Sequence, residues 1–70
     1  MGRRLQDRVE DLATERYGRG TALETERIPT GWTVRIWNAK GVEVASVTHR
    51  EKEEALRTMK DLIIGVPGAS

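Results

Sequence analysis

The chain has 70 residues, no cysteine and a formal net charge of +1, from 12 basic and 11 acidic side chains and a neutral histidine. This composition predicts one small domain and excludes disulfides and cysteine-based metal or redox sites. The near-neutral charge disfavours a protein dedicated to duplex phosphates, which usually has a clear basic excess. No apolar run is long enough to span a membrane and no signal peptide is visible, so we expect an intracellular, cytoplasmic protein. We expect residues 1–70 to form a single domain, ordered over about residues 4–65 with a loose tail at 66–70.

The first predicted element is a helix over roughly residues 4–17. Gly18 is expected to end it, because glycine readily adopts the left-handed conformation that follows a helix. No Ser, Thr, Asp or Asn stands at its start to cap it. The apolar residues at helical spacing are Leu5, Val9, Leu12, Ala13 and Tyr17.

The segment Thr21–Ile28 is predicted to be an edge strand. It is polar, it lies between glycines and a Pro-Thr-Gly turn, and charged side chains on an edge strand oppose unwanted pairing. The alternative interpretation is an irregular loop.

A β-hairpin is predicted next. Trp32–Trp37 alternates between apolar and polar positions, and Asn38-Ala39-Lys40-Gly41 is typical of a type I turn closed by a G1 bulge. That turn pairs Asn38 with Val42 and Ile36 with Val44. The residues then expected on the core face are Trp32, Val34, Ile36, Val42 and Val44. The residues expected on the opposite face are Thr33, Arg35, Trp37, Glu43, Ala45 and Val47.

A second helix follows the hairpin directly. Thr48 and Glu51 have the spacing of a capping box, and Gly65 and Pro67 are expected to end the helix. Its apolar stripe consists of Ala55, Leu56, Met59, Leu62 and Ile63. The order is therefore α-β-β-β-α, an α+β fold in which both helices cover one face of a three-stranded antiparallel sheet.

The uncovered sheet face is the predicted partner-binding surface, with Thr33, Arg35, Trp37, Glu43, Ala45 and Val47 as its residues. Tryptophan and arginine are enriched at binding hot spots, and an exposed tryptophan beside small apolar side chains is costly for a monomer. Two alternatives remain. In the first, a strand register shifted by one residue exposes Trp32 and buries Trp37. In the second, Trp37 keeps the predicted register and only covers the stem of Arg35 or Lys40.

Residues with catalytic or metal-binding chemistry are few. His49 is the only histidine, and a ribonuclease-like role with Arg50 is a distant alternative to a simple surface position. Glu51, Glu53 and Glu54 complement the dipole of the second helix without any metal. We therefore predict no catalytic residues, no cofactor and no metal site.

The α-β-β-β-α order resembles the double-stranded-RNA-binding domain over nearly the whole chain. That family binds phosphates with a lysine cluster at the start of its last helix, whereas this chain has His49-Arg50-Glu51-Lys52-Glu53-Glu54 there. The segment from Gly31 to Ile63 also resembles the three-stranded-sheet DNA-binding domains of phage integrase arms and plant AP2-type factors. Trp32, Arg35 and Trp37, followed by a helix with Glu54-Ala55, are the residues of that likeness.

The leading functional prediction is a small non-enzymatic interaction module that binds a protein partner, or a second copy as a homodimer, through the open sheet face. The alternative is a nucleic-acid-binding domain that uses the three-stranded sheet, similar to either family above. It is less favoured because of the charge balance. Its contact residues would be Arg27, Arg35, Trp37 and Lys40.

Overall fold

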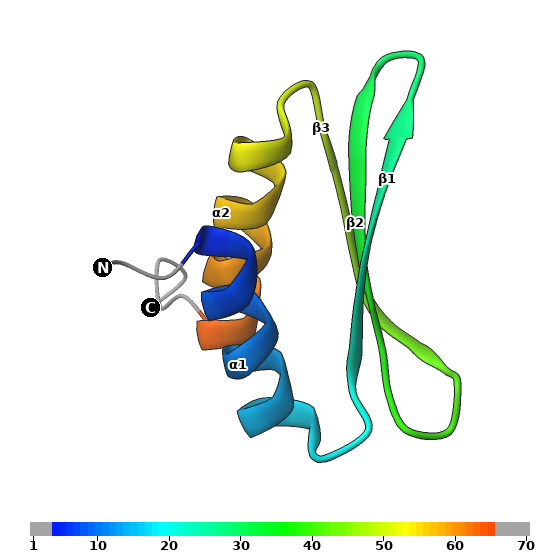
Figure 1. The fold of residues 1–70 in the computed structure, drawn as a ribbon, viewed down its shortest axis with the longest axis vertical. Helices are drawn as coiled ribbons and strands as arrows, with labels where there is room; N and C mark the ends of the chain where they lie inside the picture. Colours follow the sequence, from blue (N-terminus) through cyan, green and yellow to red (C-terminus); the bar gives the residue numbers. More distant parts are fainter. Residues whose placement is uncertain (1–3, 66–70) are drawn as a thin grey trace.

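A computed structural model describes residues 4–65, which form two helices and three strands in the predicted order α-β-β-β-α (Figure 1). The tail expected at residues 66–70 lies outside this range. Neither helix between residues 4 and 65 has the length and apolar character needed to cross a membrane. The elements are α1 (Leu5–Tyr17), β1 (Ala22–Ile28), β2 (Gly31–Trp37), β3 (Glu43–His49) and α2 (Lys52–Ile64).

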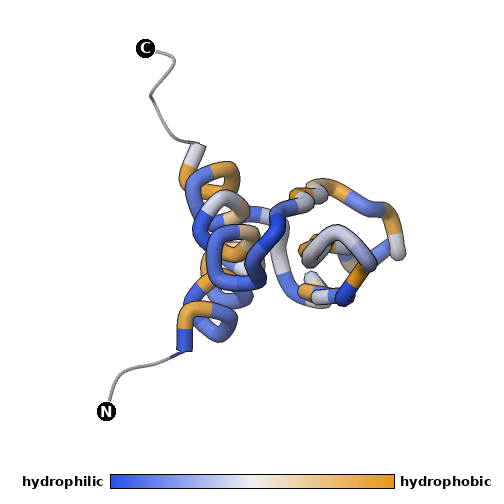
Figure 2. Tube along the Cα trace, turned by 90° about the horizontal axis from the view of Figure 1, so that it is seen from above, coloured by the Kyte–Doolittle hydropathy of each residue, from blue (hydrophilic) through white to orange (hydrophobic). Residues whose placement is uncertain are grey.

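The molecule has two layers, and both helices cover the same face of the sheet (Figures 1 and 2). The strands form one antiparallel sheet with β2 in the middle. Apolar side chains from both helices and from β2 and β3 meet between the layers, as the hydrophobic periodicity predicts. The buried core consists of Val9, Ala13, Val34, Ile36, Val47, Ala55, Leu56, Met59 and Ile63.

The start of α2 differs from the prediction. The residue that precedes the helix is Glu51, which makes no side-chain cap, so the predicted capping box of Thr48 and Glu51 is wrong. Thr48 lies in β3, where its hydroxyl oxygen is 3.2 Å from that of Thr33 on the neighbouring strand. The cross-strand hydrogen bond and the continued pairing of β3 up to His49 therefore replace the local cap.

The turn between β1 and β2 depends on Gly31. Its φ angle is 151°, and a Cβ atom there would lie 2.2 Å from the carbonyl oxygen of His49 and 2.6 Å from the Cα atom of Arg50. Both atoms belong to the backbone at the end of β3, so a side chain has no room unless the strands move apart. The close approach of these two backbones holds the β1–β2 turn against the segment that leads into α2.

The turn between β2 and β3 has the predicted geometry. The amide of Asn38 donates to the carbonyl of Val42 at 2.9 Å, the amide of Gly41 donates to the carbonyl of Asn38 at 2.9 Å, and Gly41 has a φ of 79°. The side-chain oxygen of Asn38 also accepts hydrogen bonds from the amides of Lys40 and Val42. The local sequence therefore specifies this turn correctly.

The strand register changes one step beyond the turn. Trp37 lies opposite Glu43, but Ile36 lies opposite Ala45, so Val44 is an extra residue in β3 and forms a β-bulge. The predicted pair of Ile36 with Val44 is thus wrong. Because side chains alternate along a strand, the single extra residue exchanges the two faces for the rest of β3.

The bulge corrects the predicted open face. Ala45 and Val47 lie on the helix side of the sheet, where Val47 opposes Val34 and is 9% exposed, so neither belongs to the partner-binding surface as predicted. Val42, expected in the core, is 55% exposed. The bulge is favoured because it turns Ala45 and Val47 toward the helices and so removes their apolar side chains from water.

The face assignment of β2 is correct as predicted. Val34 and Ile36 are fully buried against the helices. Arg35 and Trp37 therefore point to the opposite, open face, and a register that exposes Trp32 in place of Trp37 does not occur.

Candidate protein-binding face

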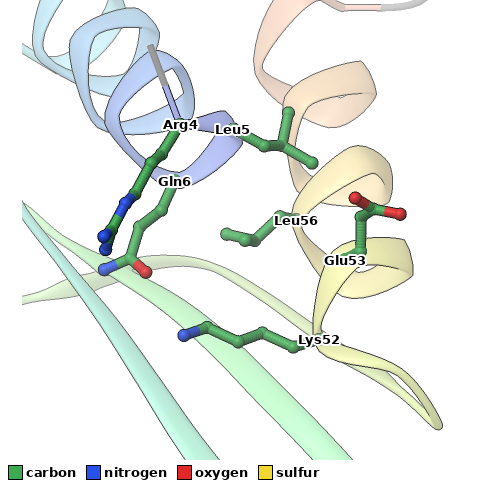
Figure 3. Close-up of a pocket in the computed structure, with 6 residues that line it drawn as sticks. All are labelled: Arg4, Leu5, Gln6, Lys52, Glu53 and Leu56. Carbon is green, nitrogen blue, oxygen red and sulfur yellow. The ribbon is translucent and has the colours of Figure 1, made fainter. Parts of the chain in front are cut away.

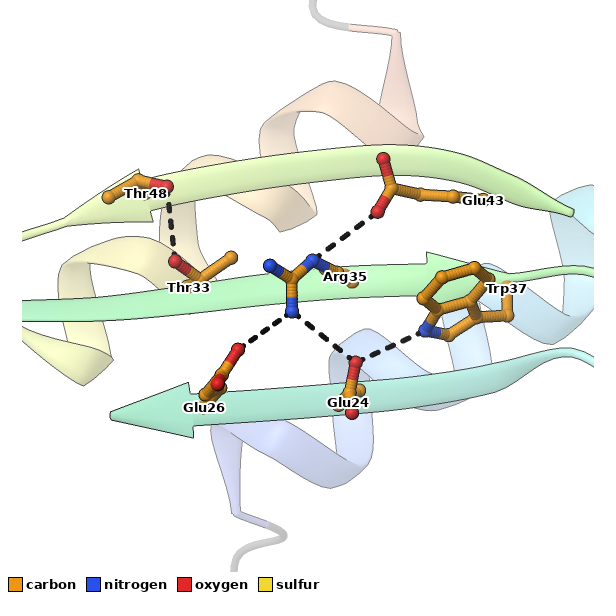
Figure 4. Close-up of polar contacts among 7 residues, drawn as sticks. All are labelled: Glu24, Glu26, Thr33, Arg35, Trp37, Glu43 and Thr48. Carbon is orange, nitrogen blue, oxygen red and sulfur yellow. Dashed lines mark hydrogen bonds and ion pairs between the residues drawn. The ribbon is translucent and has the colours of Figure 1, made fainter. Parts of the chain in front are cut away.

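Arg35 occupies the middle of the open sheet face and lies among three carboxylates (Figure 4). Its Nη1 atom is 2.9 Å from Oε1 of Glu26 and 3.6 Å from Oε1 of Glu24, both on β1. Its Nε atom is 3.3 Å from Oε1 of Glu43 on β3. We call Arg35 with Glu24, Glu26 and Glu43 the Arg35 cluster.

Strand pairing explains how these residues meet. Glu24 lies directly opposite Arg35 in the register of β1 and β2, and Glu26 follows two positions along the same face. Glu43 reaches the cluster because it precedes the bulge and lies opposite Trp37. Glu43 was predicted as a residue of the partner-binding surface, whereas Glu24 and Glu26 were expected near the sheet face but were not included in that surface. The signal for them was the alternation of β1, which places every second residue beside the open face of β2.

The Arg35 cluster is negatively charged overall, because three carboxylates and one guanidinium leave a formal net charge of −2. The hydrogen bond with Glu26 is the largest effect and raises the pKa of Arg35 above its ordinary value. Desolvation opposes this rise, and the charges of Glu26, Glu24 and Glu43 each add to it. The Arg35 side chain is 31% exposed, whereas the three glutamates are 41–54% exposed. The surface therefore presents carboxylates to the solvent above a partly shielded cation.

Trp37 lies beside the cluster and is half-buried. Its indole N–H donates to Oε1 of Glu24 at 3.3 Å, which fixes the ring against β1 (Figure 4). Thr33 is only 5% exposed and is hydrogen-bonded to Thr48. The open face thus combines the indole of Trp37 with three carboxylates. Ala45 and Val47, the small apolar side chains predicted beside Trp37, are not part of it.

The structure does not bring together the residues of the alternative nucleic-acid surface. Arg27 lies opposite Trp32, so its side chain projects from the helix side of the sheet. Lys40 belongs to the β2–β3 turn. Arg35 and Trp37 remain on the open face, where the guanidinium is already paired with carboxylates. These four residues do not form one basic surface.

His49 ends β3, is exposed, and lies opposite Trp32. Within residues 4–65, no group of three or more histidine or carboxylate side chains is arranged to hold a metal ion. In the Arg35 cluster the guanidinium occupies the position between the carboxylates that a cation would otherwise take.

Comparisons with protein-family models, with curated proteins and with solved structures find no match to this chain.

Proposed function

We propose that the chain is a small non-enzymatic interaction module whose open sheet face binds a positively charged segment of a protein partner. The observation that supports this proposal is the Arg35 cluster, which has a formal charge of −2 and carboxylates more exposed than its cation. Lysine or arginine side chains of a partner would pair with the outer oxygens of these glutamates, and Trp37 would supply the apolar contact.

Charge also selects between the two partners considered for this face. A face-to-face homodimer would place two clusters of charge −2 against each other. Like charges in apposition disfavour a complex, and Arg35 is already paired with its own carboxylates. A basic partner is therefore favoured over a second copy.

The two kinds of contact contribute differently to the affinity. Exposed ion pairs contribute only about 0.2–1 kcal/mol each, so the glutamates mainly select the partner and accelerate association. Trp37 is the expected hot spot, and Trp37→Ala is expected to weaken binding by about 2 kcal/mol or more.

The test uses the two tryptophans of the chain, Trp32 and Trp37, as separate reporters. In a Trp32→Phe protein, tryptophan fluorescence reports only on Trp37 at the open face. A short peptide that alternates lysine with threonine is expected to change this emission saturably, whereas the corresponding glutamate–threonine peptide is not. The affinity is expected to fall as salt is added, because the attraction is electrostatic.

A matched pair of variants identifies the surface. Glu24→Gln combined with Glu43→Gln is expected to weaken binding of the lysine peptide about tenfold, since two contacts with cationic groups are lost. Glu10→Gln combined with Glu15→Gln removes the same two charges from the exposed surface of α1 and is expected to leave the affinity within about twofold. Equal binding by all three proteins, or equal binding of both peptides, would rule out this function for the open face.

A further inference from the structure

A second surface of opposite charge lies on the helix side of the sheet, at the end where the β1–β2 turn approaches α2. Arg27, Trp32 and His49 lie opposite one another across the three strands, so their side chains share this face. The ammonium group of Lys52, from the first turn of α2, lies 5.2 Å from the centre of the Trp32 ring. The basic side chains near Trp32 are therefore Arg27 from β1 and Lys52 from α2.

Beside Trp32 lies a hollow of about 260 Å³, which we call the basic hollow. Arg27 and Arg50 line it together with Trp32 and the backbone of the β1–β2 turn at Thr30 and Gly31, and no carboxylate lines it. Within residues 4–65, neither guanidinium forms an ion pair. Arg35, with three carboxylates around it, has the opposite environment.

A neighbouring hollow of about 290 Å³ extends the positive surface toward α1. Arg4 lines it from one side and Lys52 from the other, with Gln6 between them (Figure 3). Figure 3 shows that the polar ends of these three side chains point toward the sheet, while the carboxylate of Glu53 points away from them. The basic hollow thus has further cations beside it, which raise the local positive potential.

We propose that the basic hollow binds a phosphate group. Each guanidinium has a planar fork of N–H donors that matches phosphate oxygens. Arg27 of β1 and Arg50 of the loop between β3 and α2 line the same hollow, and neither forms an ion pair within residues 4–65. The ligand is thus a phosphate compound, supplied either as a small phosphate ester or as part of a nucleic-acid strand. This site is separate from the open face and independent of the function proposed there.

The test uses the other single-tryptophan protein. In a Trp37→Phe variant, Trp32 is the only tryptophan, and its emission is separated from that of Tyr17 by selective excitation of the indole. We would titrate it at low salt with inorganic phosphate, with a mononucleotide and with a short oligothymidylate, and a saturable change in emission with at least one of these probes is expected. Tight binding by the oligonucleotide alone, with a steep salt dependence, identifies a nucleic-acid strand as the ligand. Comparable binding of all three probes identifies a small phosphate compound.

Variants locate the binding site. Arg27→Gln with Arg50→Gln is expected to weaken binding of the best probe by at least about tenfold. Arg19→Gln, which removes an exposed arginine from the loop between α1 and β1, is expected to stay within about twofold. Because neither Arg27 nor Arg50 has an ion-pair partner within residues 4–65, the thermal unfolding midpoint is expected to change little.

If the double variant is unstable, the single variants are compared instead, and each is expected to bind about threefold more weakly. No change in Trp32 emission with any probe, or undiminished binding by the variants, would overturn the proposal.

Discussion

The bulge at Val44 decides which side chains the open face presents, and a pair of alanine substitutions tests it. Val47 is 9% exposed on the helix side, whereas the adjacent Ser46 is exposed on the open side. Val47→Ala removes two methyl groups, or about 1.6 kcal/mol at 0.8 kcal/mol per buried carbon. The residual cavity increases this cost, so we expect the free energy of unfolding to fall by about 2 kcal/mol. Ser46→Ala is expected to change it by less than about 0.5 kcal/mol.

Thermal and urea unfolding followed by circular dichroism measure both effects. For a domain of this size, a loss of 2 kcal/mol corresponds to a melting temperature lower by about 8–16 °C. In urea, the midpoint is expected to move with an unchanged slope, which separates a loss of stability from a change in the unfolded state. If the two strands paired without the bulge, Val47 would lie on the open face. A small effect of Val47→Ala, no larger than that of Ser46→Ala, would therefore refute the register.

Three further predictions follow from individual contacts. Gly31→Ala is expected to lower the thermal unfolding midpoint much more than Gly41→Ala. Both glycines have positive φ angles, but only at Gly31 would a Cβ atom meet backbone atoms. Similar midpoints for the two variants would argue against the close approach of Gly31 to the backbone after β3. Arg35→Gln is expected to destabilise the fold at low salt and less so at high salt, since it leaves three neighbouring carboxylates unneutralised; a loss unaffected by salt in thermal unfolding would contradict the Arg35 cluster. Lys52→Met is expected to cost about 0.5–1 kcal/mol in urea unfolding and to change Trp32 emission, because the ammonium–indole contact is lost, whereas unchanged emission would argue against that contact.

The fold class was predictable because the local signals agree with one another. The β2–β3 turn illustrates this, since Asn38 and Gly41 have the residue types that the turn requires and the observed hydrogen bonds follow. The alternation of β2 likewise predicted the buried positions of Val34 and Ile36. Periodicity and turn chemistry act over a few residues, so they are readable without tertiary structure.

The bulge and the start of α2 were not predictable by the same means. No glycine or proline marks Val44, and the extra residue is explained only by the burial of Ala45 and Val47 against the helices. The Thr48–Glu51 pattern fits a cap, but Thr48 pairs with Thr33 across the sheet. At the bulge and at the start of α2, a contact between residues distant in sequence therefore outweighs the local sequence preference.

The candidate site was predicted in part. Arg35, Trp37 and Glu43 lie together on the open face as expected. Ala45 and Val47, which were expected beside them, lie on the helix side instead. Glu24 and Glu26 take its place, because the edge strand β1 was recognised without its register. The replacement narrows the proposed partner from any protein, or a second copy of the chain, to a basic protein segment.

Both proposals depend on the separation of charge within this small domain. The open face has an excess of carboxylates around Arg35, while Arg27 and Arg50, which form no ion pair within residues 4–65, line the basic hollow. The net charge of +1 is therefore the sum of two surfaces of opposite sign and of the remaining residues. A balanced composition does not by itself exclude a local basic site, which depends on how the strands place each side chain.

The measurement that tests this account most directly is a pair of two-dimensional amide NMR titrations of the unmodified chain. One uses the lysine–threonine peptide and the other uses the oligothymidylate. The account predicts that the peptide shifts the signals of Glu24, Arg35 and Trp37, and that the oligonucleotide shifts those of Arg27, Trp32 and Arg50. Shifts by both ligands in the same residues, or peptide shifts confined to the helices, would contradict the assignment of separate binding surfaces to the two faces.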